Sequence, residues 1–198
     1  MIMIKKNQVN RMIQILIIIT LFSACKSISY QSAKHSNEDK FYGEKEENAL
    51  IMVDMKDLSQ LIEDISGLTE EKAFAKDIYD FGKSAAKDHK KLQNQLKILA
   101  FKKRAKLPSA LKEDNQEIYR SLHKITDRKT FDRVYMEEMI KALQILADMS
   151  DDFLEEGKDK QMRNFVTKHS GIFKSEIKRI NTIQEYIEKP YSEILSKE

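Results

Sequence analysis

The sequence predicts an all-α fold, an antiparallel four-helix bundle with a short extra helix between the second and third long helices. Apolar residues recur at steps of three and four along four long stretches, which places them on one face of a helix. No stretch of useful length alternates as a half-buried strand would. Five glycines and two prolines in 198 residues leave long stretches free to stay helical.

The first 25 residues predict a lipoprotein signal peptide. A basic segment precedes an apolar run over 15–22, which is shorter than the roughly 20 residues that span a bilayer core but suits a signal peptide. The run closes on a lipobox, in which small residues precede a cysteine that receives a diacylglyceryl group. This lipobox is Leu21-Phe22-Ser23-Ala24-Cys25.

We therefore expect Cys25, the only cysteine of the chain, to be the lipid attachment site. A buried structural cysteine is the alternative. Lipidation would hold the protein in the bacterial cell envelope, at the outer membrane and facing the periplasm, with the membrane as its partner. A single cysteine also excludes a disulfide within the chain.

The net charge argues against nucleic-acid binding. Thirty-five basic and 32 acidic residues give +3, but Lys5, Lys6 and Arg11 lie in the predicted signal peptide, so 35 minus three leaves 32 basic residues against 32. The basic excess therefore belongs to targeting, and no nucleic-acid partner is expected.

Residues 26–47 predict a flexible polar tether. Ser, Lys, Asn, Gln and Glu dominate them and apolar periodicity is weak, so they would bury little surface. Such a coil would hold the domain roughly 25 Å from the membrane. Residues 48–198 are then expected to form a single helical bundle domain.

The first two long helices are predicted from their apolar faces. The first runs from about residue 48 to Gly67, and the second starts after Thr69, with carboxylates in its first turn, and ends near Arg104. Their apolar positions are Ile51, Met55, Leu58, Ile62 and Ile65, then Phe74, Ile78, Phe81, Ala85, Leu92, Leu96 and Leu99.

A shorter helix over about 112–124 is expected to pack across the end of the bundle. The third long helix would be capped by Thr130 and run to Gly157. The fourth begins near Asp159 and ends at Pro190, with Gly171 softening its middle.

Enzyme chemistry finds no support in the sequence. Carboxylate-bridged di-iron bundles use Glu-x-x-His motifs, and this chain has none. It also lacks a Gly-x-Ser-x-Gly elbow and a glycine-rich phosphate loop. We expect no catalytic residue, no cofactor and no enzymatic activity.

Two histidines continue apolar helix faces. His89 follows Ala85 by four residues in the second long helix, and His169 lies on the apolar face of the fourth. Two inward histidines would share a metal or tune a pocket, whereas hydrogen-bonded core histidines are the alternative.

Two charged clusters lie near helix ends. Carboxylates near the end of the third long helix repel one another and oppose the helix dipole, so a cation or basic partner would explain them; a solvated face paired with neighbouring lysines is the alternative. Cations at the end of the second long helix complement its dipole, and a lipid-headgroup patch is the alternative. The clusters are Asp148, Asp151, Asp152, Glu155 and Glu156, and Lys102, Lys103, Arg104 and Lys106.

Several sequence blocks resemble one protein family. They are Phe81-Gly82-Lys83-Ser84-Ala85-Ala86-Lys87-Asp88-His89, then Leu96, Leu99-Ala100, Leu107-Pro108 and Leu122, then Phe131-Asp132-Arg133-Val134-Tyr135 with Met139. Over roughly 50–187 the chain resembles the domain-of-unknown-function 4142 family. The resemblance implies an exported bacterial protein, often a lipoprotein, with a ferritin-like four-helix bundle, and it implies no established activity.

The chain departs from the family pattern at polar positions. Ala142-Leu143 stands where a later Asp-His would follow, and residues near Gly171 and Glu176 replace a Leu-Pro and a downstream histidine. Compared with the family pattern, little of the polar constellation remains around His89.

We therefore expect a lipid-anchored envelope protein with a non-catalytic binding or structural role. One alternative is a metal or small-ligand carrier that uses the bundle interior, with His89, His169 and Glu176 as candidate ligands. The other is an interaction module that docks an unidentified envelope protein through the acidic helix face.

Overall fold

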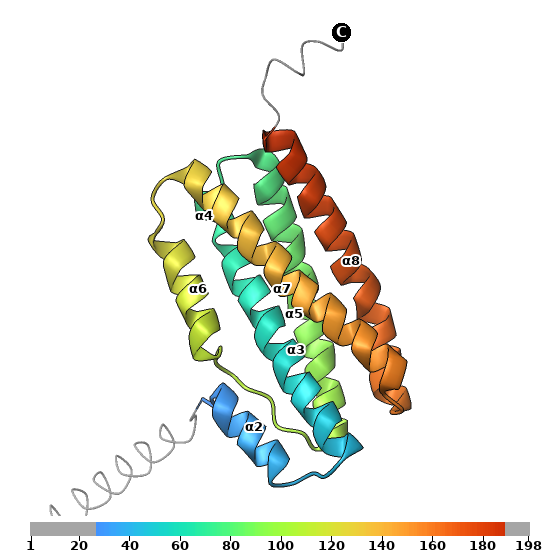
Figure 1. Ribbon diagram of the computed structural model, residues 1–198. Helices are drawn as coiled ribbons and strands as arrows, with labels where there is room; N and C mark the ends of the chain where they lie inside the picture. Colours follow the sequence, from blue (N-terminus) through green and yellow to red (C-terminus); the bar gives the residue numbers. More distant parts are fainter. Residues whose placement is uncertain (1–26, 189–198) are drawn as a thin grey trace, which may run out of the picture.

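The computed structural model describes residues 27–188, which form an all-α bundle (Figure 1). The predicted four-helix bundle is confirmed: its long helices are α3, α5, α7 and α8. The predicted signal peptide with Cys25, and the predicted helix end at Pro190, lie outside the described residues. The helices are α2 (Tyr30–Glu38), α3 (Glu44–Gly67), α4 (Thr69–Lys72), α5 (Lys76–Lys103), α6 (Glu113–Lys124), α7 (Arg128–Glu156) and α8 (Lys160–Glu188).

Among the described helices, none is both long and apolar enough to cross a membrane.

Contacts at the helix ends fix the topology. Asp132, at the start of α7, accepts hydrogen bonds from the amides of Phe74 (3.1 Å) and Ala75 (2.8 Å), just before α5, so α5 and α7 begin at the same end. At the other end, Lys103 Nζ lies 2.6 Å from Asp159 Oδ2, where α8 begins. α5 and α7 thus run one way and α3 and α8 the other, and the connection through α6 is the long crossover of ferritin-like bundles (Figure 1).

The position of α6 differs from the prediction. It does not cross the end of the bundle but lies along α3 and contacts α7 (Figure 1). Asp57 of α3 holds the start of α6 there, because its carboxylate accepts hydrogen bonds from Lys112 N (2.7 Å) and Asn115 Nδ2 (2.6 Å). Burial raises the pKa of Asp57 above its ordinary value.

The prediction of a flexible tether over 26–47 is wrong for its described part. α2 packs on α3, and both Ala33 and Asn37 are fully buried. The Asn37 amide donates to Lys106 O (2.9 Å) and accepts from Lys106 N (2.8 Å), which satisfies both backbone groups of one residue in the crossover connection. A polar side chain, invisible to an apolar pattern, therefore fixes this segment.

The folded unit also begins earlier than residue 48. Ile28 N donates to Ser109 Oγ (2.7 Å), and Ser109 N donates to Ile28 O (2.9 Å). Ile28, three residues after Cys25 in the sequence, is thus already part of the folded unit.

Two helix starts were predicted wrongly. The second long helix is interrupted between α4 and α5, because Asp132 holds the free amides of the break, and Phe74 is 60% exposed there instead of buried. Asp127, not Thr130, caps α7: its Oδ1 accepts from Thr130 N at 2.8 Å. α8 remains a continuous helix through Gly171.

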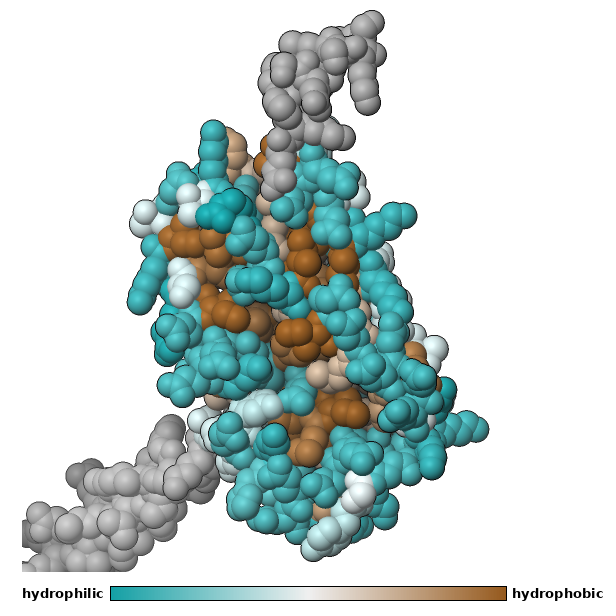
Figure 2. All heavy atoms as spheres, in the orientation of Figure 1, coloured by the Kyte–Doolittle hydropathy of each residue, from teal (hydrophilic) through white to brown (hydrophobic). Residues whose placement is uncertain are grey.

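The core is built from the predicted stripes. Large apolar side chains from all four long helices meet between them, and on the face in Figure 2 apolar patches lie between hydrophilic side chains. The largest fully buried side chains include Phe81, Phe131, Tyr135, Phe173, Met52, Met55 and Leu96.

Candidate functional site

A buried polar pair joins α5 to α8. His89 Nε2 lies 3.0 Å from Glu176 Oε2, and the two residues are 1% and 9% exposed. The ring of Phe173 stacks on the imidazole, with centroids 5.9 Å apart. The structure therefore brings together two of the three residues predicted as interior ligands.

The third candidate pairs elsewhere. His169 Nε2 lies 3.1 Å from Gln95 Oε1, which also accepts from Lys168 Nζ at 3.1 Å. Burial, assisted by the charge of Lys168, lowers the pKa of His169 to about 4, so its imidazole is neutral at pH 7. Both histidines face inward, as their helical positions predicted.

Each imidazole retains an unpartnered nitrogen. The Nδ1 atom of each ring is buried, and neither Nδ1 has a hydrogen-bond partner in the described part of the chain. Across residues 27–188, however, no group of three or more His, Cys, Asp or Glu side chains is placed to hold a metal.

A second polar contact lies deeper in the bundle. Ser66 Oγ and Tyr135 OH are 2.9 Å apart, and Ser66 Oγ also donates to Met139 Sδ at 3.8 Å. Burial raises the pKa of Tyr135. Sequence reasoning missed Ser66 and Gln95. For Ser66 the signal was its position four residues after Ile62 on the buried face.

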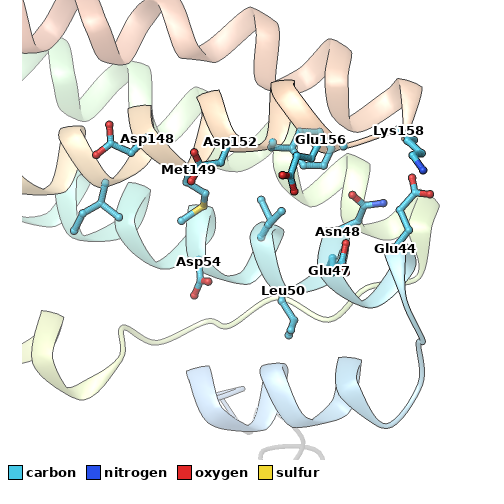
Figure 3. Close-up of a pocket in the computed structure, with 14 residues that line it drawn as sticks. Glu44, Glu47, Asn48, Leu50, Asp54, Asp148, Met149, Asp152, Glu156 and Lys158 are labelled. Atoms are coloured by element: carbon cyan, nitrogen blue, oxygen red, sulfur yellow. The ribbon is translucent and has the colours of Figure 1, made fainter.

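A groove of about 900 Å³ runs between the first half of α3 and the last turns of α7 (Figure 3). We call it the acidic groove. Its apolar lining includes Leu50, Ile51, Ile145, Met149 and Phe153. Its carboxylates are Glu44, Glu47, Asp54, Asp148, Asp152 and Glu156.

The charges of the acidic groove are not balanced within the protein. Lys158 is the one cation that lines it among residues 27–188, and no carboxylate of the groove forms an ion pair with another described residue. Asp148 accepts from Gln144 Nε2 (2.7 Å) and Asp54 from the Tyr30 hydroxyl, both neutral donors.

The five acidic residues that formed the predicted cluster on α7 therefore fall into two groups. Asp148, Asp152 and Glu156 face the groove, whereas Asp151 pairs with Lys174 of α8 at 2.7 Å and Glu155 does not line the groove. The solvated face with neighbouring lysines thus describes Asp151. Sequence reasoning missed the three carboxylates of α3, because two of them fall in the predicted tether.

A second hollow, of about 870 Å³, lies on the other side of the start of α3. Phe101 does not line this hollow but directly precedes Lys102, which does, and we call the hollow together with Phe101 the basic face. Tyr42 and Phe101 are 82% and 84% exposed there. Its cations are Lys40, Lys45, Lys102, Lys103 and Arg104.

Solved structures show the same fold at low identity. CopM in its Cu(II)-bound form matches with a TM-score of 0.60 and 14% identity, over 70% of this chain and 96% of CopM. A DUF305 fragment from Deinococcus radiodurans matches with a TM-score of 0.61 and 8% identity, over 69% of this chain and 93% of the fragment. At these identities the likeness concerns the fold alone.

Sequence comparison assigns the family. No curated protein matches this chain. The model of the domain of unknown function DUF4142 matches residues 34–183, which span most of the bundle and the last part of α2. The resemblance carried by the Asp-His and Phe-Asp-x-x-Tyr blocks is thereby confirmed, and the chain belongs to the DUF4142 family.

Proposed function

We propose that this chain is a lipid-anchored protein of the bacterial cell envelope that acts as a non-catalytic binding module, with the acidic groove as its binding surface. One observation carries the proposal: six carboxylates from two helices surround an apolar floor, only one lining cation, Lys158, is present among the described residues, and none of these carboxylates forms an ion pair there.

Helix electrostatics support a binding role. Carboxylates suit the start of α3, where amide N–H groups are free, but at the end of α7 they meet the negative pole of the dipole, and the last turn of α7 has no basic residue. Because the carboxylates at the end of α7 lower the stability of the helix and no cation in its last turn compensates for them, they support a role in binding.

The groove defines the chemistry of its ligand. Ile145 is 50% exposed and Met149 half-buried, so a ligand gains by covering them, and the carboxylates at the rim favour lysine and arginine. An amphipathic helical segment with basic flanks and an apolar stripe matches both features. Such a segment of an envelope protein is the proposed ligand.

The test uses the full chain and a helical peptide of leucine and lysine with one apolar face as the probe. We compare Asp152→Asn/Glu156→Gln, which alters the groove, with Asp151→Asn/Glu155→Gln, which makes the same charge change outside it. At low salt the groove variant should bind at least about tenfold more weakly, which corresponds to about 1.4 kcal/mol.

The outer pair should change the affinity by less than about twofold. Equal losses in both variants would mean that the peptide senses net charge alone, and the groove would not be the binding surface.

Lipid anchoring has its own test. Mass spectrometry of the protein from membranes should find a mature N-terminus at Cys25 carrying acyl groups, and Cys25→Ser should abolish both processing and membrane retention. An unmodified thiol on an uncut precursor would remove the lipid anchor from the proposal.

A metal or small-ligand carrier is the second candidate. Two buried, unpartnered Nδ1 atoms on neighbouring helices favour it, and the similar fold of CopM has been solved in Cu(II)-, Cu(I)- and Ag-bound forms. The described residues do not fit a three- or four-ligand site of His, Cys, Asp or Glu, which places this candidate second. Stoichiometric metal in the purified protein, lost in His89→Ala, would reverse the order.

A further inference from the structure

We propose that the basic face lies against an anionic lipid bilayer and orients the bundle on the membrane. This inference rests on the proposed lipid anchor and adds a second, non-covalent membrane contact. It names the occupant of the basic face as lipid headgroups.

The short distance between the anchor and the fold is the first argument. Ile28 is bound to Ser109, and only three residue steps separate it from Cys25, so the two Cα atoms lie within about 10 Å of each other even in a fully extended chain. A domain held this closely touches the bilayer surface instead of hanging from a tether.

The segments next to the anchor lead directly to the basic face. From Ile28, α2 runs along the crossover connection, to which Asn37 binds through Lys106, and Lys40 Nζ donates to Arg104 O at 2.7 Å. The segment that follows Ile28 and the segment that leaves α5 therefore meet at the basic face.

Exposed aromatic rings between cations are the second argument. Burial inside the protein stabilises most aromatic side chains of the bundle, but Tyr42 and Phe101 are more than four-fifths exposed. Aromatic rings flanked by lysine and arginine match the interfacial layer of a bilayer, in which rings enter the headgroup region and cations meet phosphates.

Arg104 is the third argument. It follows α5 with a φ of 58°, the left-handed conformation that glycine adopts at lower cost at a helix C-terminus. Glycine at this position would make the fold more stable, so we infer that the guanidinium of Arg104 serves binding and not folding. Lys45, Lys102 and Arg104 are exposed and have no ion pair within the described residues, whereas Lys103 is paired with Asp159.

This orientation is compatible with the acidic groove. The groove and the basic face share Glu44 and Asn48 but open on different sides of α3. Most residues that line the groove do not line the basic face, so contact of the basic face with anionic headgroups leaves them free to bind a basic ligand.

Tryptophan fluorescence tests the inference, because the chain has no tryptophan. The full lipidated chain is placed in vesicles that contain phosphatidylglycerol and brominated lipid, with Phe101→Trp as reporter and Tyr186→Trp as control. Tyr186 is 64% exposed near the far end of α8, about 40 Å along the helix from Asp159. We expect strong quenching and a blue-shifted emission at position 101 and neither at 186.

A charge variant makes the test specific. Adding Lys45→Gln, Lys102→Gln and Arg104→Gly to the Phe101→Trp chain should remove most of the quenching, as should vesicles in which phosphatidylcholine replaces phosphatidylglycerol and the brominated lipid is kept. Arg104→Gly by itself should raise the melting temperature and weaken the quenching, so a loss of contact cannot be ascribed to unfolding.

The outcomes separate the two proposals. Protein attached to vesicles with an unquenched Trp at position 101 would overturn the membrane contact and leave the lipid anchor intact. Protein that fails to attach at all would overturn both. Equal quenching at positions 101 and 186 would show that no fixed face meets the bilayer.

Discussion

The acidic groove and the basic face lie at the same end of the bundle, on two sides of α3, and carry opposite charge. At the end of α5 the cations match the helix dipole, and Lys103 has a partner in Asp159. At the end of α7 the carboxylates oppose the dipole, and those in the groove have no ion pair within residues 27–188. The fold therefore explains Lys102 and Lys103 at the end of α5 better than it explains the carboxylates at the end of α7.

The reverse holds for the apolar side chains of the two regions. Phe153 and Met149 in the groove also pack against the core, whereas Phe101 and Tyr42 on the basic face are almost fully exposed. In each region the feature that the fold does not explain indicates the ligand: carboxylates indicate a cationic segment, and exposed rings between cations indicate a bilayer.

The largest expected effect is a loss of stability that leaves both binding surfaces unchanged in the folded molecules. A Cβ at Gly82 would lie 2.1 Å from Thr69 Oγ1, whose hydrogen bond to Ser66 O (2.7 Å) fixes that side chain. Gly82→Ala should therefore lower the free energy of unfolding by about 1–3 kcal/mol in urea titrations. Both binding surfaces should keep their properties in the molecules that remain folded.

Gly171 provides the matched control for that substitution. A Cβ there meets nothing within 4 Å, so Gly171→Ala should raise the free energy of unfolding by roughly 0.5–1 kcal/mol through helix propensity. An equal rise in both variants would show that α4 and α5 do not pack as described.

Acid should lower the free energy of unfolding through His169. The pKa of His169 is about 4 in the folded chain, below the ordinary 6.5. Between these values the folded chain binds fewer protons than the unfolded chain, so the free energy of unfolding falls as pH falls from 6.5 toward 4. Chemical denaturation at pH 7 and pH 5 measures this loss, and His169→Gln should reduce it.

Two buried carboxyl groups act in the opposite direction. Burial raises the pKa of Asp57 and Asp132, so the folded chain binds more protons there and gains stability as pH falls. The difference between wild type and His169→Gln isolates the histidine, and an identical pH dependence in the two proteins would contradict its buried, neutral state.

Removing the charges at the ends of α7 and α5 should change the free energy of unfolding in opposite directions. Asp152→Asn/Glu156→Gln on α7 should raise the free energy of unfolding by about 0.3–1 kcal/mol per residue, because it removes charges that oppose the dipole. Lys102→Gln/Lys103→Gln on α5 should lower it by a similar amount. Thermal melts at low salt measure both, and a loss of stability in the α7 variant would mean that the groove carboxylates stabilise the fold after all.

The smallest expected effect comes from Asp151, which lies on α7 outside the groove. Asp151 and Lys174 form an exposed ion pair, so Asp151→Asn should change stability by less than about 1 kcal/mol. Raising the salt concentration should remove this difference. A larger or salt-resistant change would assign Asp151 a role that its exposed position does not explain.

Apolar periodicity was enough to predict the bundle and the inward direction of His89 and His169, because a period of 3.6 residues fixes which side chains share a face. The family resemblance added the ferritin-like fold. Pairings between distant segments escaped prediction. The bond of Asn37 to Lys106, and that of Asp132 to the break before α5, depend on contacts that no local pattern contains.

Only half of the candidate site could be predicted from the sequence, for the same reason. The acidic end of α7 stood out in the sequence, but the groove exists only because α3 places Glu47 and Asp54 opposite it. His89 was predicted as an inward residue, yet its pairing with Glu176 rather than with His169 depends on the register of α5 against α8.

Hydrogen exchange of the full chain with and without the leucine–lysine peptide tests the central claim most directly. We predict slower amide exchange on peptide binding over 47–54 of α3 and 145–156 of α7, the two segments that form the acidic groove. Unchanged exchange in both segments, with protection between α5 and α8 instead, would contradict the claim that the groove is the binding surface.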